Sequence, residues 1–210
     1  MQTLFELIKK RSPLRLIAIL LTLFIFAGCS SLPPEPDHGV EWKLHQTQVQ
    51  AITRYTLQGK MAYISPDERQ SLNLYWKQTP AKSDLRLSTF LGQTALNMDF
   101  TPMHAKVEVH DGRTFEHPDI NLLIKRLSGM SIPVQELTEW VKGVPAGTYD
   151  YQVSELNTLS ELNTVVSGQP WTLQFERYQQ VDDLLLPARI TMISGDQTIK
   201  LSISKWTLNP

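Results

Sequence analysis

The sequence has little cysteine and little clustered charge. Cys29 is the only cysteine among 210 residues, so the chain can form no internal disulfide and no thiolate cluster for a metal. Its 20 Lys and Arg residues are balanced by 21 Asp and Glu residues, and beyond the N-terminus they form no basic patch or run. Nucleic-acid-binding domains carry such patches, so we expect no nucleic-acid partner.

Long hydrophobic runs are also scarce. The longest, residues 16–27, has twelve residues, whereas a membrane-spanning helix needs about 20. It ends at the small pair Ala27-Gly28, and it follows the basic residues Lys9, Lys10, Arg11 and Arg15. This is the pattern of a signal peptide, and we expect the mature chain to be anchored to a membrane without spanning it.

Motifs for catalysis are missing as well. The chain has no Gly-x-Ser-x-Gly elbow, no Walker loop and no dinucleotide fingerprint. Its five histidines include no His-Glu-x-x-His pair, and we expect His104 and His110 to be solvated or packed rather than metal ligands. The acids Asp182 and Asp183 lie in a polar stretch that we interpret as a loop. We therefore expect no enzymatic activity, no cofactor and no metal.

At the N-terminus, Cys29 stands directly after Phe26-Ala27-Gly28. This arrangement resembles the acceptor site of a bacterial lipoprotein signal, although an aliphatic residue is commoner in the place of Phe26. The resemblance implies cleavage before Cys29, diacylglycerol on its sulfur and an acyl chain on its new amino group. Because Ser30 rather than aspartate follows, it also implies an outer-membrane address. The alternative is a stray cysteine behind an ordinary signal peptide.

Three segments follow from these features. Residues 1–28 are expected to be a signal peptide, residues 29–39 a lipidated cysteine with a Pro-rich extended tether, and residues 40–210 a single domain. Removal of residues 1–28 leaves a net charge of about −4. Two or more acyl chains hold a protein on a membrane stably, whereas one holds it only marginally.

Most of the domain alternates apolar and polar residues with a period of two, as strands with one buried face do. Such segments recur about every ten to twelve residues from Leu57 to Phe100, and again from Tyr149 to Ile203. The dipeptides Asp111-Gly112 and Gly195-Asp196 are expected hairpin turns. The pattern predicts a mainly β (α+β) fold with a strongly curved antiparallel sheet of about ten strands.

Three helices interrupt the strands. The first is expected to run from Val40 to about Arg54. The second follows Asp119 as its cap and ends at Gly129, and the third lies between Pro133 and Gly143. We expect the last two, which are apolar on one side, to cover the concave face of the sheet.

The pentapeptide Ser-Glu-Leu-Asn-Thr occurs twice within residues 154–164. A single echo is too short for a repeat architecture. We interpret it as a local duplication in a loop.

The apolar side chains, five tryptophans among them, must be buried either in a filled core or around a ligand-sized cavity. The sequence pattern leaves both possibilities open. The candidates for the cavity wall and the lid are Leu72, Leu74, Trp76, Leu85, Leu87, Leu96, Met98, Phe100, Leu123, Ile124, Leu127, Val134, Leu137, Trp140, Val141, Leu173, Phe175, Ile190, Met192 and Leu201.

Several motifs, in order and over nearly the whole mature chain, resemble those of the LolB family of outer-membrane lipoprotein receptors. They are Tyr63–Ser65, Leu74–Gln78, Leu87–Gly92, Leu127–Val134, Trp140–Pro145 and the terminal segment Ile199–Trp206. The most specific stretch runs from Gly129-Met130-Ser131-Ile132-Pro133 to Pro145.

The resemblance implies an unclosed antiparallel β-barrel of ten or eleven strands with a helical lid over an apolar cavity. It implies a non-catalytic monomer on the periplasmic side of the outer membrane. This receptor would take acylated lipoprotein cargo from a LolA-like periplasmic carrier and pass it to outer-membrane lipid. The alternative is a non-catalytic lipoprotein scaffold with a filled core in an envelope assembly complex. A lipid-modifying enzyme is disfavoured because no nucleophile–base pair is visible.

The family also places a leucine before a glycine on a protruding loop that helps to insert cargo into the membrane. The segment Phe90-Leu91-Gly92 matches that place, with Phe90 where the family often has proline. The resemblance therefore implies that Leu91 is exposed. From the alternation alone, Leu91 would instead be an inward strand residue in step with Leu85 and Leu87.

Overall fold

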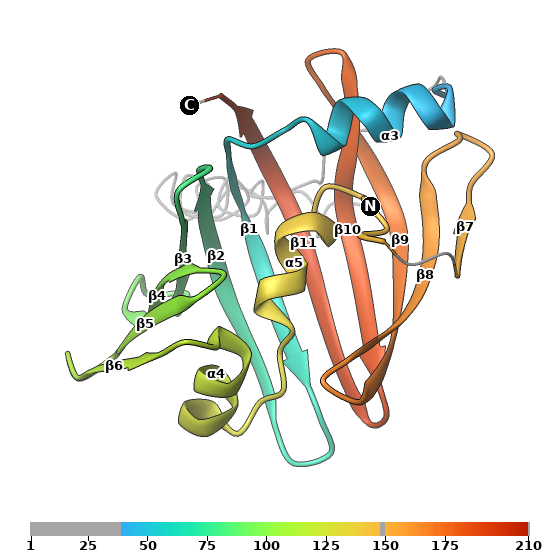
Figure 1. The fold of residues 1–210 in the computed structure, drawn as a ribbon. Helices are drawn as coiled ribbons and strands as arrows, with labels where there is room; N and C mark the ends of the chain where they lie inside the picture. Colours follow the sequence, from blue (N-terminus) through green and yellow to red (C-terminus); the bar gives the residue numbers. More distant parts are fainter. Residues whose placement is uncertain (1–38, 148–149, 210) are drawn as a thin grey trace, which may run out of the picture. The chain divides into compact units, whose positions relative to one another are not determined.

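The computed structural model describes residues 39–147 and 150–209, which belong to one compact unit built on a single antiparallel sheet (Figure 1). Its eleven strands are β1 (Tyr55–Ile64), β2 (Arg69–Gln78), β3 (Ser83–Ser88), β4 (Thr94–Thr101), β5 (His104–Val109), β6 (Thr114–His117), β7 (Tyr151–Val153), β8 (Leu159–Val166), β9 (Gln169–Val181), β10 (Leu184–Ser194) and β11 (Gln197–Leu208).

The strand order is β6-β5-β4-β3-β2-β1-β11-β10-β9-β8-β7, so the first and last strands meet in the middle of the sheet. Strands β6 and β7 are the two edges, and the sheet is therefore not closed. The expected unclosed antiparallel sheet is confirmed.

In the described part of the chain, three helices accompany the sheet: α3 (Trp42–Gln50), α4 (Ile120–Ser128) and α5 (Val134–Trp140). Helices α4 and α5 lie on one face of the sheet, and α3 crosses the ends of the strands near β10 (Figure 1). None of the described helices combines the length and the apolar character that a bilayer crossing requires.

Local capping sets the helix bounds. The carboxylate of Glu41 accepts hydrogen bonds from the backbone N–H groups of Lys43 and Leu44, so α3 starts later than residue 40 and is shorter than expected. Asp119 caps α4 through the N–H of Leu122 and Gly129 ends it at φ +73°, as the sequence predicts.

The period-two pattern places most strands correctly because they bury one face, as β2, β3 and β5 do. In β2 and β3, for example, Leu74 lies opposite Leu87 and Trp76 opposite Leu85, all four on the buried face. The expected turns at residues 111–112, 182–183 and 195–196 all join neighbouring strands.

The interpretation of residues 154–164 as a loop is wrong for its second half. The first copy of the echo forms a turn closed by the N–H of Ser154 on the carbonyl of Thr158 at 2.8 Å. The second copy lies in β8. The fully buried residues of β8, Leu159 and Leu162, are three positions apart rather than two. The alternation that identifies most of the other strands is therefore missing in β8.

Cys29, the signal segment and most of the tether lie outside the described residues, as does Tyr149 of the expected strand at 149–151. The expectations for these residues stay predictions.

Candidate functional site

The side chains predicted to line a cavity converge on one face of the sheet, beneath α4 and α5. All of them are buried except Leu96 and Leu127, which are half-buried. They form one contiguous hydrophobic cluster with the inward residues of both helices. In this structure the helices are therefore closed onto the sheet and cover most of its concave face.

Aromatic rings occupy the middle of this cluster. The Trp76 ring lies 6.3 Å from that of Tyr55 and 6.4 Å from that of Phe100, and Tyr55 lies 5.3 Å from Trp206. Within the described residues, the buried Nε1 of Trp76 has no hydrogen-bond acceptor. A buried donor without an acceptor costs about 1–3 kcal/mol. The indole N–H of Trp76 is such an unpaired donor, and it lies among apolar side chains of the concave face.

The C-terminal end of α5 is fixed to the sheet. The hydroxyl of Tyr55 donates to the carbonyl of Thr138 at 3.2 Å. Burial and the nearby Glu139 carboxylate raise the pKa of Tyr55, which keeps this hydroxyl a donor. Just beyond α5, the buried Nζ of Lys142 lies 3.2 Å from the carbonyl of Ile52 and 3.0 Å from Glu139 Oε2.

The two helices are joined to each other through one side chain. Asn121 of α4 donates to Glu136 Oε2 of α5 at 2.9 Å, and its Oδ1 accepts from the backbone N–H of Gln135 at 3.1 Å. We call α4, α5 and the connecting residues 129–133 (the connector) together the lid.

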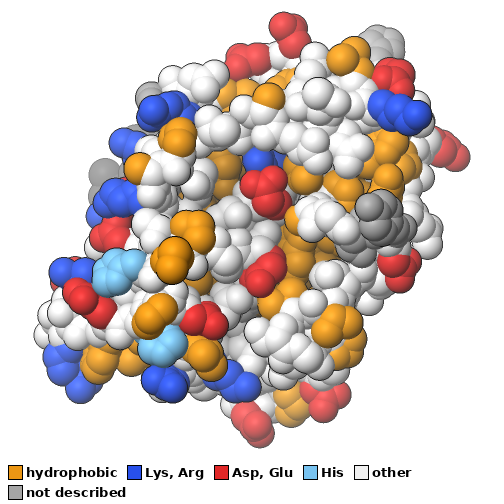
Figure 2. Space-filling model, in the orientation of Figure 1, with side chains coloured by type: hydrophobic (Ala, Val, Ile, Leu, Met, Phe, Trp, Pro, Cys, Tyr) orange, Lys and Arg blue, Asp and Glu red, His pale blue; other side chains and the backbone are white. Residues whose placement is uncertain are grey.

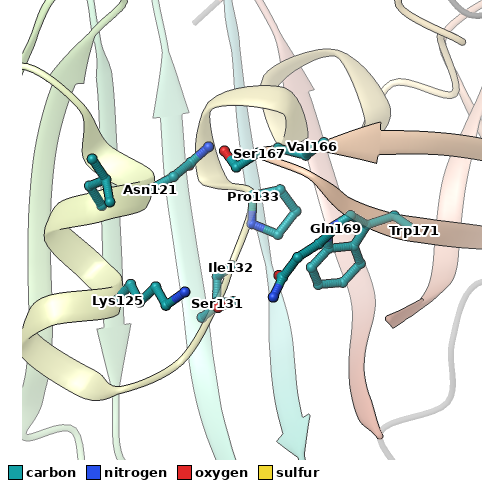
Figure 3. A pocket seen from close by; sticks show the side chains of 10 residues that line it. Asn121, Lys125, Ser131, Ile132, Pro133, Val166, Ser167, Gln169 and Trp171 are labelled. Atoms are coloured by element: carbon teal, nitrogen blue, oxygen red, sulfur yellow. The ribbon is translucent and has the colours of Figure 1, made fainter. Parts of the chain in front are cut away.

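Hollows surround the connector at one end of the sheet. The first, the lid-edge pocket of about 190 Å³, lies between α4 and the β8–β9 hairpin and is lined by Lys125, Ile132, Pro133 and Trp171 among others (Figure 3). Figure 2, in the orientation of Figure 1, shows the surface hollowed to the right of its centre, with apolar side chains inside.

Two wider grooves adjoin the same segment. The β3–β4 groove, about 870 Å³, is lined by Leu72, Leu96 and Met130 and by residues 89 and 93–95. The hairpin groove, about 640 Å³, lies between residues 128–130 and the turns at 65–68 and 194–197. The side chains of Met130 and Ile132 are each only 5% exposed between these hollows, and burying such a side chain is worth about 1.5–3 kcal/mol.

The loop between β3 and β4 holds two apolar side chains in solvent. Phe90 is 86% exposed and Leu91 is 72% exposed. The loop is closed by hydrogen bonds from the N–H of Thr89 to the carbonyl of Gln93 and from the N–H of Gly92 to the carbonyl of Thr89, both 2.9 Å. The alternative in which Leu91 is an inward strand residue is therefore wrong.

Sequence reasoning left three residues of this region out of the candidate set: Met130, Ile132 and Trp171. The first two lie on the connector, where no periodic pattern marks a buried side chain. The signal that could have found them was the motif Gly129-Met130-Ser131-Ile132-Pro133, which carries the family resemblance. Among residues 39–147 and 150–209, no three His, Cys, Asp or Glu side chains gather as metal ligands would.

Comparison with known proteins identifies the family. The family model described as "Outer membrane lipoprotein LolB" matches residues 53–206, which include the concave face and the whole lid. This chain belongs to the LolB family. The resemblance of its motifs to those of the LolB family is thereby confirmed.

Relatives of the LolB family match the chain over almost its full length. Outer-membrane lipoprotein LolB of Vibrio atlanticus is 41% identical over 94% of this chain and 99% of its own. The protein of the same name from Vibrio cholerae is 38% identical over 93% and 97%. Among solved structures, a DUF1329 family protein from Desulfovibrio piger matches with a TM-score of 0.50 and 9% identity, covering 79% of this chain and 90% of that one. That likeness concerns the fold alone.

Proposed function

We propose that this chain is a lipid-anchored receptor of the outer membrane that accepts lipoproteins from a LolA-like periplasmic carrier and inserts them into that membrane. The observation that carries the proposal is the apolar concave face beneath the lid, in a member of the LolB family. The acyl chains of the cargo would enter between this face and the lid. No bond is made or broken in such a transfer.

The driving force would be apolar burial. Moving acyl surface out of water is worth about 25 cal/mol per Å², so a small difference in fit between carrier and receptor is enough to set the direction of transfer. Cys29, as a lipidated anchor, would hold the receptor beside the membrane that receives the cargo. Replacing Cys29 by alanine is then expected to weaken targeting more than acyl-chain binding.

The test is transfer in solution. A form that lacks residues 1–28 and carries Cys29→Ala is mixed with an acylated lipoprotein loaded on the carrier, and cargo in each protein is measured after separation. We expect the cargo to move to this chain. Failure to acquire cargo, with a cooperative unfolding transition retained, would reject the receptor.

The second candidate is a non-catalytic scaffold in an envelope assembly complex. The packing of the lid against the concave face favours it, because a scaffold needs no room for acyl chains. The same transfer experiment separates the two functions, since a scaffold would leave the cargo on the carrier while keeping its own fold.

The β3–β4 loop supplies the insertion step of the proposal. Phe90 and Leu91 present two exposed apolar side chains on a turn braced at its base by Asn73, whose amide donates to the carbonyl of Thr89 at 2.9 Å. Such a pair would enter the headgroup region and disturb the bilayer where the acyl chains leave the receptor.

A further inference from the structure

We propose that Met130 and Ile132 act as a built-in plug, which occupies the place of acyl chains at the open end of the sheet until cargo displaces it. This inference rests on the proposed function and adds a regulatory part to it: the empty receptor would fill its own binding site with its own side chains.

The position of the connector is the first observation. The lid-edge pocket contacts it at residues 131–133, and the β3–β4 and hairpin grooves contact it at Met130. The connector thus separates hollows that would otherwise adjoin one another. Moving it outward would open a passage from the β3–β4 loop to the β8–β9 hairpin.

The second observation is how the connector is held. Within the described residues its hydrogen bonds are all local: Gly129 N–H to the carbonyl of Lys125, Met130 N–H to Ser128 Oγ, and the carbonyls of Ile132 and Pro133 to N–H groups of α5. No strand of the sheet takes part in them. What keeps the connector in place is therefore the burial of Met130 and Ile132, an interaction that another apolar group can replace.

The third observation is the chemistry of the two side chains. Methionine is unbranched and flexible, and it fills irregular apolar space much as a short alkyl chain does. An apolar cavity left empty loses the dispersion contacts of its lining. Filling the site with Met130 and Ile132 avoids that loss without cargo, and exchange for an acyl chain keeps the total burial nearly constant.

The attachment of α5 fits such a movement. The C-terminal end of α5 is fixed through Tyr55 and Lys142. The two hydrogen bonds of Asn121 to α5, which we call the Asn121 clasp, keep α4 and α5 together. The connector is at the opposite end of α5 from those fixed contacts. A small rotation of α5 about its fixed end would therefore move the connector more than it moves residues 138–142.

The experiment measures binding of a dansyl-labelled fatty acid by the form that lacks residues 1–28 and carries Cys29→Ala. Met130→Ala is compared with Val49→Ala, at a fully buried residue of α3 that belongs neither to the lid nor to the candidates for the cavity wall. We expect Met130→Ala to bind the probe about tenfold more tightly than the unaltered chain, because less must be displaced. We expect Val49→Ala to stay within about twofold of it.

Three results would overturn the plug. Equal affinities of the unaltered chain and Met130→Ala would do so, as would an equal gain in Val49→Ala, which would mean that any new cavity binds the probe. Absence of binding by all three proteins would reject the proposed function, and the plug with it.

A measurement on the unaltered chain removes the dependence on a variant that folds poorly. Probe binding should increase hydrogen exchange at the amides of residues 130–132, while the amides of β4 around Met98 stay protected. Slower exchange in the connector on binding would mean that the probe settles under a plug that does not move.

Discussion

Asn121 of α4 binds both the side chain of Glu136 and the backbone of Gln135 in the first turn of α5, at 2.9 and 3.1 Å. One side-chain amide thereby uses its donor and its acceptor on the neighbouring helix. The connector between the helices has only five residues, and its own hydrogen bonds are local. The clasp is what makes two short helices a single lid.

Loss of the clasp should loosen the lid more than the sheet. We predict that Asn121→Ala lowers the free energy of unfolding by about 1–2 kcal/mol and speeds hydrogen exchange at Gln135. Asn121→Asp is the matched variant, because it keeps an acceptor for Gln135 but places a carboxylate against Glu136. Its stability should recover partly with added salt. Unchanged exchange at Gln135 in Asn121→Ala would show that packing alone joins the helices.

Exposure of Leu91 makes a sharp functional test possible. We predict that Leu91→Asp leaves stability within about 0.5 kcal/mol of the unaltered chain, as surface substitutions usually do. Cargo acceptance from the carrier should also be retained. Delivery into phosphatidylethanolamine–phosphatidylglycerol vesicles should fall, because a carboxylate does not enter the apolar part of a bilayer.

Met103 provides the control for that test. It is 84% exposed in the β4–β5 turn, at the other end of β4 from Leu91. Met103→Asp should deliver cargo at the normal rate. If Leu91→Asp also delivers at the normal rate, or both variants fail alike, the β3–β4 loop has no special part in insertion.

Gly143, just after α5, should tolerate no side chain. Its φ is +78°, and an added Cβ would lie 3.0 Å from the hydroxyl of Tyr178. That hydroxyl is itself fixed by donation to the carbonyl of Leu159 at 2.7 Å. We predict that Gly143→Ala lowers the free energy of unfolding by about 2–5 kcal/mol, from left-handed backbone strain of about 1–2 kcal/mol and crowding of about 1–3 kcal/mol.

Gly112 separates the two contributions. Its φ is +82°, but an added Cβ there would meet nothing within 4 Å. Gly112→Ala should therefore lose only the backbone part, measured by urea unfolding of both variants side by side. Equal losses would mean that Tyr178 moves away freely and that the end of α5 is not tightly packed.

The buried histidine of α3 should make stability depend on pH. His45 is 2% exposed, and burial lowers its pKa below the ordinary value of 6.5. As pH falls through 6.5 the unfolded chain takes up the proton first, so the folded state loses stability from there down to the lowered pKa. Above pH 6.5 both states are neutral and His45 has no effect.

Urea unfolding between about pH 7.5 and 5 measures this effect, given the ordinary histidine pKa near 6.5. His45→Gln should flatten the pH dependence in that window, whereas His104→Gln, at an exposed position, should not. A pH profile identical in His45→Gln and the unaltered chain would assign the dependence to other groups.

The sequence by itself determined most strands and both lid helices. Alternation with period two predicts a face to bury, and Asp119 and Gly129 mark the ends of α4 through capping that involves only neighbouring residues. The period-two pattern did not predict strand β8, because its buried residues Leu159 and Leu162 are three positions apart. Its position comes from pairing with β9, a contact that local periodicity does not report.

Only the tertiary structure decided where strand β3 ends and which residues cover the open end of the sheet. The apolar series Leu85, Leu87 and Leu91 could run on as one strand, but the chain turns at Gly92, with φ +83°, and Leu91 is left in solvent. Met130 and Ile132 belong to no periodic segment, yet they are buried because the curved sheet leaves an open end that the connector covers. Periodicity states which side of an element faces inward, whereas the place where a sheet stops and what fills the gap depend on distant segments meeting in space.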